Sequence, residues 1–202
     1  MSITARIVSN LNIAGFAMSS TIQRQAESGL PKAFTLPAGK AGVVNGDGGI
    51  DLAAGHGFEA TQVVAVHWTD GVALKSCRML TIDNAAAGEI DFTGAGEGEA
   101  LPAAETDVVV SLQVVSEGVT FDGDKVKALA VKSTRNAVVD MRTSATSKIV
   151  LPLTADEAFW WADGHYGDNP VADAEIAQIV ASNATTQAAT LHFAALLDTV
   201  EN

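Results

Sequence analysis

The 202-residue sequence is poor in cysteine, in aromatic residues and in long apolar runs. Cys77 is the only cysteine, so no intrachain disulfide can form, which fits assembly in a reducing cytoplasm. Aromatic residues make up 5% of the chain, so we expect a core of Ala, Val, Leu and Ile. No run approaches the roughly 18 apolar residues of a membrane-spanning helix, and residues 1–10 lack a signal-peptide pattern. We therefore expect no contact with a membrane.

Basic residues are also scarce, and they are unevenly placed. The formal net charge of −12 argues against direct binding of nucleic acid, which normally needs a face rich in Lys and Arg. Residues 149–202 contain many acidic side chains and no Lys or Arg, whereas residues 1–42 contain Glu27 as their only acidic residue. We expect the basic N-terminal residues to contact the acidic segment of a neighbouring copy, although a solvated acidic face that keeps the protein soluble is an equal alternative. These candidate interface residues are Arg6, Arg24, Lys32 and Lys40.

Short alternating or β-branched runs that end at Gly, Asn, Asp or Pro are abundant, which is typical of β-strands and turns. The run from Thr61 to Thr69 is followed by Asp70-Gly71 and a second run from Val72 to Ile82, which predicts a β-hairpin. Phe16 to Ala26 alternates with polar residues and predicts a strand near the N-terminus. Further strands are expected at residues 89–92, 107–115, 119–121, 126–133, 136–142, 148–153, 158–161, 175–182 and 188–197.

Helix signals are weak, and Ala172 to Ser182 is the one stretch that favours a short helix as an alternative to a strand. Two glycine-rich stretches, Gly39 to Gly57 and Gly94 to Pro102, predict loops, and neither has a phosphate-binding pattern. We therefore predict an all-β fold of antiparallel β-sandwich or barrel modules with an extended N-terminal arm. The predicted division is an arm with the first strands (1–38), a β module (39–120) and a β-sandwich module (121–202).

No residue pattern for catalysis or metal binding is evident. The four histidines form none of the HxH, HxxxH or HExxH pairs that bind metals, and no GxSxG motif is present. Cys77 precedes Arg78, a cation that favours the thiolate, but a buried inert thiol is the simpler interpretation. We predict that the protein is not an enzyme and that it needs neither a metal nor a cofactor.

The segment from Phe159 to Pro170 is unusual, because it holds two of the three tryptophans and the only tyrosine. Trp160 and Trp161 cannot both point inward from one strand, so one of them should be exposed or lie at an interface. Three interpretations remain open: an interface, an ordinary core with a loop, and a sugar-binding site. The interface candidates are Phe159, Trp160, Trp161 and Tyr166, and the ligand-binding candidates are Trp161, Asp163, Tyr166 and Asp168.

Several turn and strand motifs resemble those of uncharacterised virion structural proteins of tailed phages. They lie from Gly39 onward and read GHG (55–57), WTDG (68–71), GAGEGEALP (94–102), FWWADG (159–164) and DNPVAD (168–173), with an alternating strand at 190–197. The resemblance implies a component of the particle, assembled in the host cytoplasm, and it supplies no catalytic residues. It implies that the partners are copies of the chain itself, possibly as a trimer, and the major capsid protein or other virion proteins.

Within that class we expect a capsid decoration (cement) protein, whose compact β body and basic arm lie across an acidic capsid exterior. A tail tube subunit that forms stacked rings is the nearest alternative, because an acidic lumen would repel DNA. A carbohydrate-binding β-sandwich for host attachment is a further alternative, and it depends on the aromatic segment.

Overall fold

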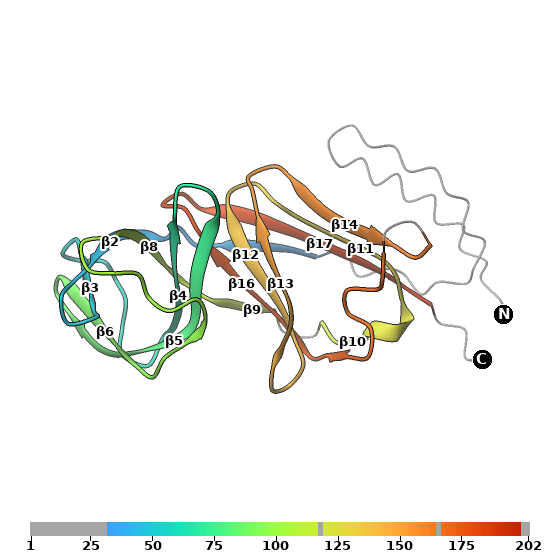
Figure 1. Ribbon diagram of the computed structural model, residues 1–202, viewed down its shortest axis with the longest axis horizontal. Coiled ribbons are helices and arrows are strands. Elements are labelled where there is room, and N and C mark those ends of the chain that lie inside the picture. Colours follow the sequence, from blue (N-terminus) through green and yellow to red (C-terminus); the bar gives the residue numbers. More distant parts are fainter. Residues whose placement is uncertain (1–31, 117–118, 165–166, 199–202) are drawn as a thin grey trace.

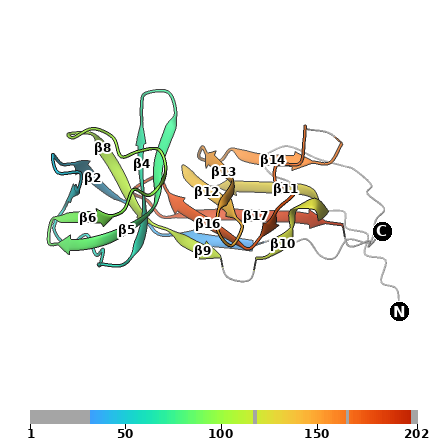
Figure 2. The same cartoon turned by 60° about the horizontal axis from the view of Figure 1, so that its bottom comes forward.

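The computed structural model describes residues 32–116, 119–164 and 167–198. The described chain is all-β, with antiparallel strands and one 3₁₀ turn, η1 (Gly123–Lys125), so the predicted fold class is confirmed. The strands form two bodies, a barrel and a sandwich, that lie end to end along the long axis (Figure 1, Figure 2).

The barrel is a closed antiparallel sheet. Its six strands follow one another in the order β4-β8-β2-β3-β6-β5, and pairing of β4 with β5 closes the ring, while β7 is added at the side of β5. Alternating inward side chains such as Ile50, Val64 and Val110 fill its interior and are fully buried. The strands are β2 (Lys40–Val44), β3 (Ile50–Leu52), β4 (Val63–Thr69), β5 (Leu74–Ala86), β6 (Glu89–Thr93), β7 (Glu97–Gly98) and β8 (Asp107–Leu112).

The sandwich packs two four-stranded sheets around a second apolar core. That core contains Leu129, Met141 and Leu191, and the rings of Phe121 and Phe193 stack within it at 6.1 Å. One sheet has the order β1 (Lys32–Leu36), β17 (Ala189–Leu197), β11 (Val126–Ser133) and β14 (Ala158–Ala162). The other has the order β13 (Ser147–Leu153), β12 (Ala137–Arg142), β16 (Gln178–Asn183) and β9 (Val114–Ser116), and a short ladder joins β10 (Phe121–Asp122) to β15 (Glu175–Ile176).

The barrel is inserted between the first strand of the sandwich and the rest of it. The chain enters the barrel through residues 37–39 and leaves through Gln113, the single residue between β8 and β9. The amide of Gly39 donates to the Thr185 carbonyl at 2.9 Å, and a Cβ at this position would lie 2.4 Å from Val109 Cγ1. Both connections are therefore short, and the first passes through a space that only glycine fits.

Local patterns predicted many of the strands correctly. The hairpin at Asp70-Gly71 is confirmed: Asp70 Oδ1 accepts from the amides of Val72 and Ala73, and Gly71 has a φ of +88°. The helix alternative for Ala172 to Ser182 is wrong, because its β-branched residues lie in β15 and β16 and are buried there.

Two stretches predicted as loops contain strands. Gly39 to Gly57 includes β2 and β3, and Gly94 to Pro102 includes β7. A Cβ on Gly42 would lie 2.7 Å from the Asp51 carbonyl oxygen of the paired strand, so glycine there permits a close approach of two backbones. These glycines serve strand packing as well as turns.

The sheet pairings also differ from the predicted modules. Residues 32–36, expected within the arm, form β1 of the sandwich, and β9, expected within the first module, is an edge strand of the sandwich. Phe16 to Ala26 and the rest of the predicted arm up to residue 31 lie outside the described residues.

Candidate functional site at the junction of the two bodies

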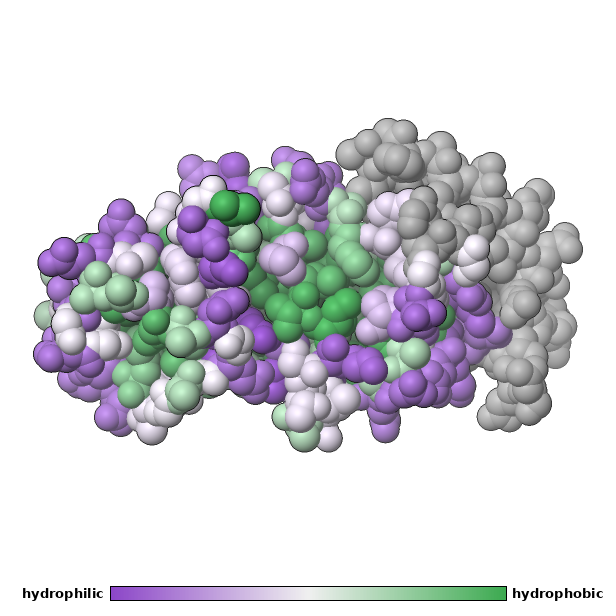
Figure 3. All heavy atoms as spheres, viewed as in Figure 1, coloured by the Kyte–Doolittle hydropathy of each residue, from purple (hydrophilic) through white to green (hydrophobic). Residues whose placement is uncertain are grey.

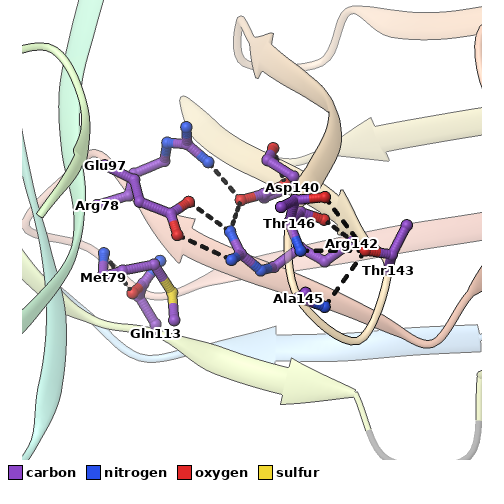
Figure 4. A network of polar contacts seen from close by, with 10 residues as sticks. Arg78, Met79, Glu97, Gln113, Asp140, Arg142, Thr143, Ala145 and Thr146 are labelled. Atoms are coloured by element: carbon purple, nitrogen blue, oxygen red, sulfur yellow. Dashed lines mark hydrogen bonds and ion pairs between the residues drawn. The ribbon is translucent and has the colours of Figure 1, made fainter.

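A cluster of charged side chains joins the barrel to the sandwich (Figure 4). Arg78 of β5 forms an ion pair with Asp140 of β12. Arg142, two residues further along β12, donates to Asp140 at 2.8 Å and reaches back to Glu97 of β7 through two hydrogen bonds of 2.6 and 2.9 Å. Ser147 Oγ donates to the second oxygen of Asp140 at 2.5 Å. We call these five residues the junction cluster.

The junction cluster is balanced in charge and buried at its centre, while Glu97 and Ser147 are partly exposed. Arg78, Asp140 and Arg142 are 6%, 1% and 4% exposed, and two guanidinium groups face two carboxylates. Hydrogen bonding to Glu97 raises the pKa of Arg142, and the same bonds lower the pKa of Glu97. Removing Arg78 or Asp140 would leave the other member of this fully buried ion pair without its partner, which typically costs about 3–5 kcal/mol.

Two uncharged contacts extend the junction into the barrel. The Gln113 side chain accepts a hydrogen bond from the amide of Met79 in β5 at 2.9 Å, and Met79 has a φ of +56°. Gln113, which connects the barrel to the sandwich, is therefore anchored on β5. His67 of β4 is 1% exposed and lies 3.2 Å from Ser111 Oγ. Burial, and secondly the charge of Arg78, lower the pKa of His67 to about 3, so this imidazole is neutral at physiological pH.

The arrangement is suited to mechanical coupling of the two bodies. Bidentate Arg–carboxylate pairs have fixed geometry, so they set the orientation of one body on the other as well as holding it. Cys77, beside Arg78, is buried, and burial raises the pKa of its thiol more than the cation lowers it. Within residues 32–116, 119–164 and 167–198, no group of three or more His, Cys, Asp or Glu side chains is placed to hold a metal ion.

The aromatic residues of β14 that were predicted to form an interface lie on two different faces of that strand. Trp161 is 6% exposed, packs in the sandwich core and directs Nε1 toward the Gly167 carbonyl at 3.4 Å. Its ring therefore has no free face to stack on a sugar. Phe159 packs partly against the same core, and Trp160, on the opposite face of β14, is partly exposed.

The remaining candidate residues are dispersed. Asp163 pairs with Lys127 at 3.1 Å, and Asp168 is exposed in the loop that follows. Lys32 lies in β1, and Lys40 is exposed at the start of β2 in the barrel. Arg6, Arg24 and Tyr166 lie outside the described residues.

Sequence reasoning missed the junction cluster. A signal was present in β12, where Asp140 and Arg142 share one face of an otherwise apolar strand, two residues apart. A charged pair on one face of a buried strand indicates a polar contact with another element. The sequence did not indicate that the other element was β5 of a separate body.

Comparison with protein-family models and with curated protein sequences found no match to this chain. Among the described residues, no helix is long and apolar enough to cross a membrane.

Proposed function

We propose that this chain is a non-enzymatic structural protein of a tailed-phage particle, most specifically a capsid decoration (cement) protein. The observation that carries the proposal is the junction cluster, which joins two β bodies into one unit. A decoration protein strengthens a shell by resisting movement between the capsid subunits that it contacts. Two bodies fixed to each other by buried ion pairs can transmit such a load, whereas two bodies on a flexible linker cannot.

The proposed partners are further copies of the chain and the major capsid protein. Charge in the sequence supports contacts between copies: residues 1–42 contain four basic residues and one acidic residue, whereas residues 149–202 contain many acidic residues and no Lys or Arg. A contact between these two parts of neighbouring molecules would bring opposite charges together.

A tail tube subunit is the second candidate. Among the described residues, the edge strands of both sandwich sheets pair with another strand on one side only. Such edges are able to pair between subunits and close a ring.

Binding to phage heads and the oligomeric state together test the proposal. Purified chain is mixed with heads that lack it, the mixture is sedimented, and the free chain is sized by light scattering. We expect co-sedimentation, greater heat resistance of the heads, and a free monomer or trimer. Stacked rings that do not bind heads would support the tail tube, and a chain that neither binds heads nor forms rings would contradict both candidates.

A further inference from the structure

Buried side chains that belong to neither apolar core lie between the barrel and the sandwich. In β4, Val64 and Val66 point into the barrel core, so the alternating side chains of Ala65 and His67 lie on the outer face of the barrel. Both are nevertheless buried, at 0% and 1% exposure, and neither belongs to an apolar core. Ser111, which alternates with core residues of β8 and lies 3.2 Å from His67, is buried in the same way. Neighbours outside the barrel must therefore cover this face.

The sandwich provides this cover. Val139 and Met141 of β12 belong to the sandwich core, so Asp140 and Arg142 lie on the opposite, outer face of the sheet, where they are buried. Val180, which pairs with Asp140 from β16, is also buried and lies outside the core. The junction cluster links this face to β5 and β7, and β16 lies beside β8. The outer faces of the two bodies therefore bury each other (Figure 1, Figure 2).

The hydrogen bonding of this interface is incomplete. Among the described residues, His67 Nδ1 and Arg142 Nε are the two buried side-chain nitrogens without a hydrogen-bond partner, and both lie between the bodies. A buried polar atom without a partner opposes burial, because it has lost its hydrogen bonds to water. Separation of the bodies would hydrate both nitrogens, so these atoms favour release while the ion pairs favour contact.

The rim of the interface is polar. Figure 3 shows polar side chains where the barrel meets the apolar surface over β12 and β13. Glu97 of the junction cluster is partly exposed although it binds Arg142. A polar rim around a buried centre is typical of protein interfaces that form reversibly, and it gives water access to the outer ion pair.

A positive charge on His67 would be unfavourable while the bodies are in contact. The charged side chains at the interface are Arg78 from β5, Glu97 from β7, and Asp140 and Arg142 from β12. Both carboxylates already bind arginines, and the charge that acts on His67 is that of Arg78. β8 contributes the neutral hydroxyl of Ser111, and its one acidic residue, Asp107, is exposed at the start of the strand. β9 and β16 contain no ionisable residue.

This environment favours the neutral imidazole. Burial, and secondly the charge of Arg78, lower the pKa of His67 from 6.5 to about 3 while the bodies are in contact. In separated bodies the imidazole is exposed to water, so its pKa returns toward 6.5. Below pH 6.5 the separated bodies therefore bind a proton that the joined bodies exclude. Contact is fully favoured above pH 6.5 and weakens as the pH falls toward 3.

We propose that the interface is a pH-sensitive latch, in which mild acid releases the barrel from the sandwich while both bodies stay folded. Each body has its own apolar core, so neither needs the other to bury its interior. Residues 37–39 and Gln113 still connect the bodies after release. A rigid unit thus becomes two bodies on short connections that can act as hinges. The inference goes beyond the proposed structural role and concerns the isolated chain.

Thiol labelling of full-length protein tests the inference. Val180→Cys places a thiol in the interface, and Val139→Cys, the matched control, places one in the sandwich core. Native Cys77, buried in the barrel core, reports on unfolding of the barrel in both variants. The variants are labelled at pH 7, 6 and 5 with a dipyridyl disulfide, which reacts with thiols in acid. Each rate is assigned to its site by peptide mass spectrometry and divided by the rate in urea-unfolded protein at the same pH.

Between pH 7 and pH 5, we expect labelling at position 180 to rise about 25-fold, the shift that follows from a pKa change from 6.5 to about 3. Labelling at position 139 and at Cys77 should not rise with it, and His67→Gln in the Val180→Cys protein should abolish the rise. The inference is overturned if position 180 shows no rise, or if position 139 or Cys77 rises equally, which would mean unfolding. These two results decide even if His67→Gln fails to fold, and where it folds, an undiminished rise also overturns the inference. Binding to phage heads is measured separately, so failure here leaves the proposed function unaffected.

Discussion

At the scale of single residues, Asp140 is the centre of the junction. Its carboxylate is 1% exposed and accepts from Arg78, Arg142 and Ser147. The energetic importance of Asp140 follows from the two arginines that it neutralises, since a buried charge without a partner is far more costly than a surface pair is favourable.

Asp140→Ala should lower the free energy of unfolding by about 3–5 kcal/mol, because it leaves the buried guanidinium group of Arg78 without its carboxylate partner and next to Arg142. Urea unfolding followed by circular dichroism measures the change. The matched control is Lys75→Ala, which removes the more exposed pairs with Asp70 at 3.7 Å and Glu99 at 3.6 Å and should change the free energy of unfolding far less. Equal losses in the two variants would show that the junction cluster contributes no more than a surface contact.

His67 should make stability depend on pH. Its pKa is lowered from 6.5 to about 3 in the folded protein, so below pH 6.5 the unfolded chain takes up a proton that the folded chain refuses. Stability contributed by the neutral imidazole is complete above pH 6.5 and falls as the pH drops toward 3. Between pH 7 and pH 5 this loss amounts to about 2 kcal/mol.

In His67→Gln this part of the pH dependence should disappear, whatever the absolute stability of the variant. Urea unfolding at pH 7, 6 and 5 gives the slope for wild-type protein and for the variant. An unchanged slope in His67→Gln would mean that this histidine takes up a proton equally in the folded and the unfolded chain, which would contradict its lowered pKa.

At the scale of elements, strands with local alternation were predictable and glycine-rich strands were not. The ranges at β11 and β17 were close to the observed ones because alternation depends on neighbouring residues alone. β2, β3 and β7 were missed because glycines lie within or directly before them, and some of these glycines permit contacts with residues far away in sequence. The ion pair of Arg78 with Asp140 spans 62 residues, and no local pattern specifies such a partner.

The contact between β7 and β5 should depend on the glycine at position 96. Gly96, just before β7, has a φ of +61°, and a Cβ there would lie 2.7 Å from the Arg78 carbonyl oxygen. Gly96→Ala should therefore lower the melting temperature and the free energy of unfolding by about 1–3 kcal/mol. Gly46→Ala, at a position with open space and no positive φ, is the matched control and should change stability little. Similar melting curves for both variants would contradict a tight β7–β5 contact.

At the scale of the whole molecule, the barrel and the sandwich should unfold together. Trp68 reports on the barrel, and Trp160 and Trp161 report on the sandwich. Two tryptophan variants with an otherwise wild-type sequence are compared. One keeps only Trp68, and the other keeps only Trp160 and Trp161. Their urea transitions, followed by tryptophan fluorescence, should coincide. In Asp140→Ala the transitions should move apart, because Arg142–Glu97 is then the one ion pair of the junction cluster that still joins the bodies. Separate transitions in the wild-type background would show that the bodies are independent.

We propose that the two coupled bodies form a structural unit of a phage particle, most specifically on the capsid. Cryo-electron microscopy of purified particles tests this proposal, because the barrel and the sandwich have distinct shapes that can be fitted to density. We expect density for both bodies, in the relative orientation set by the junction cluster, on the outer surface of the capsid at contacts between neighbouring subunits. Particles that contain no density for this chain, in head or tail, would contradict it.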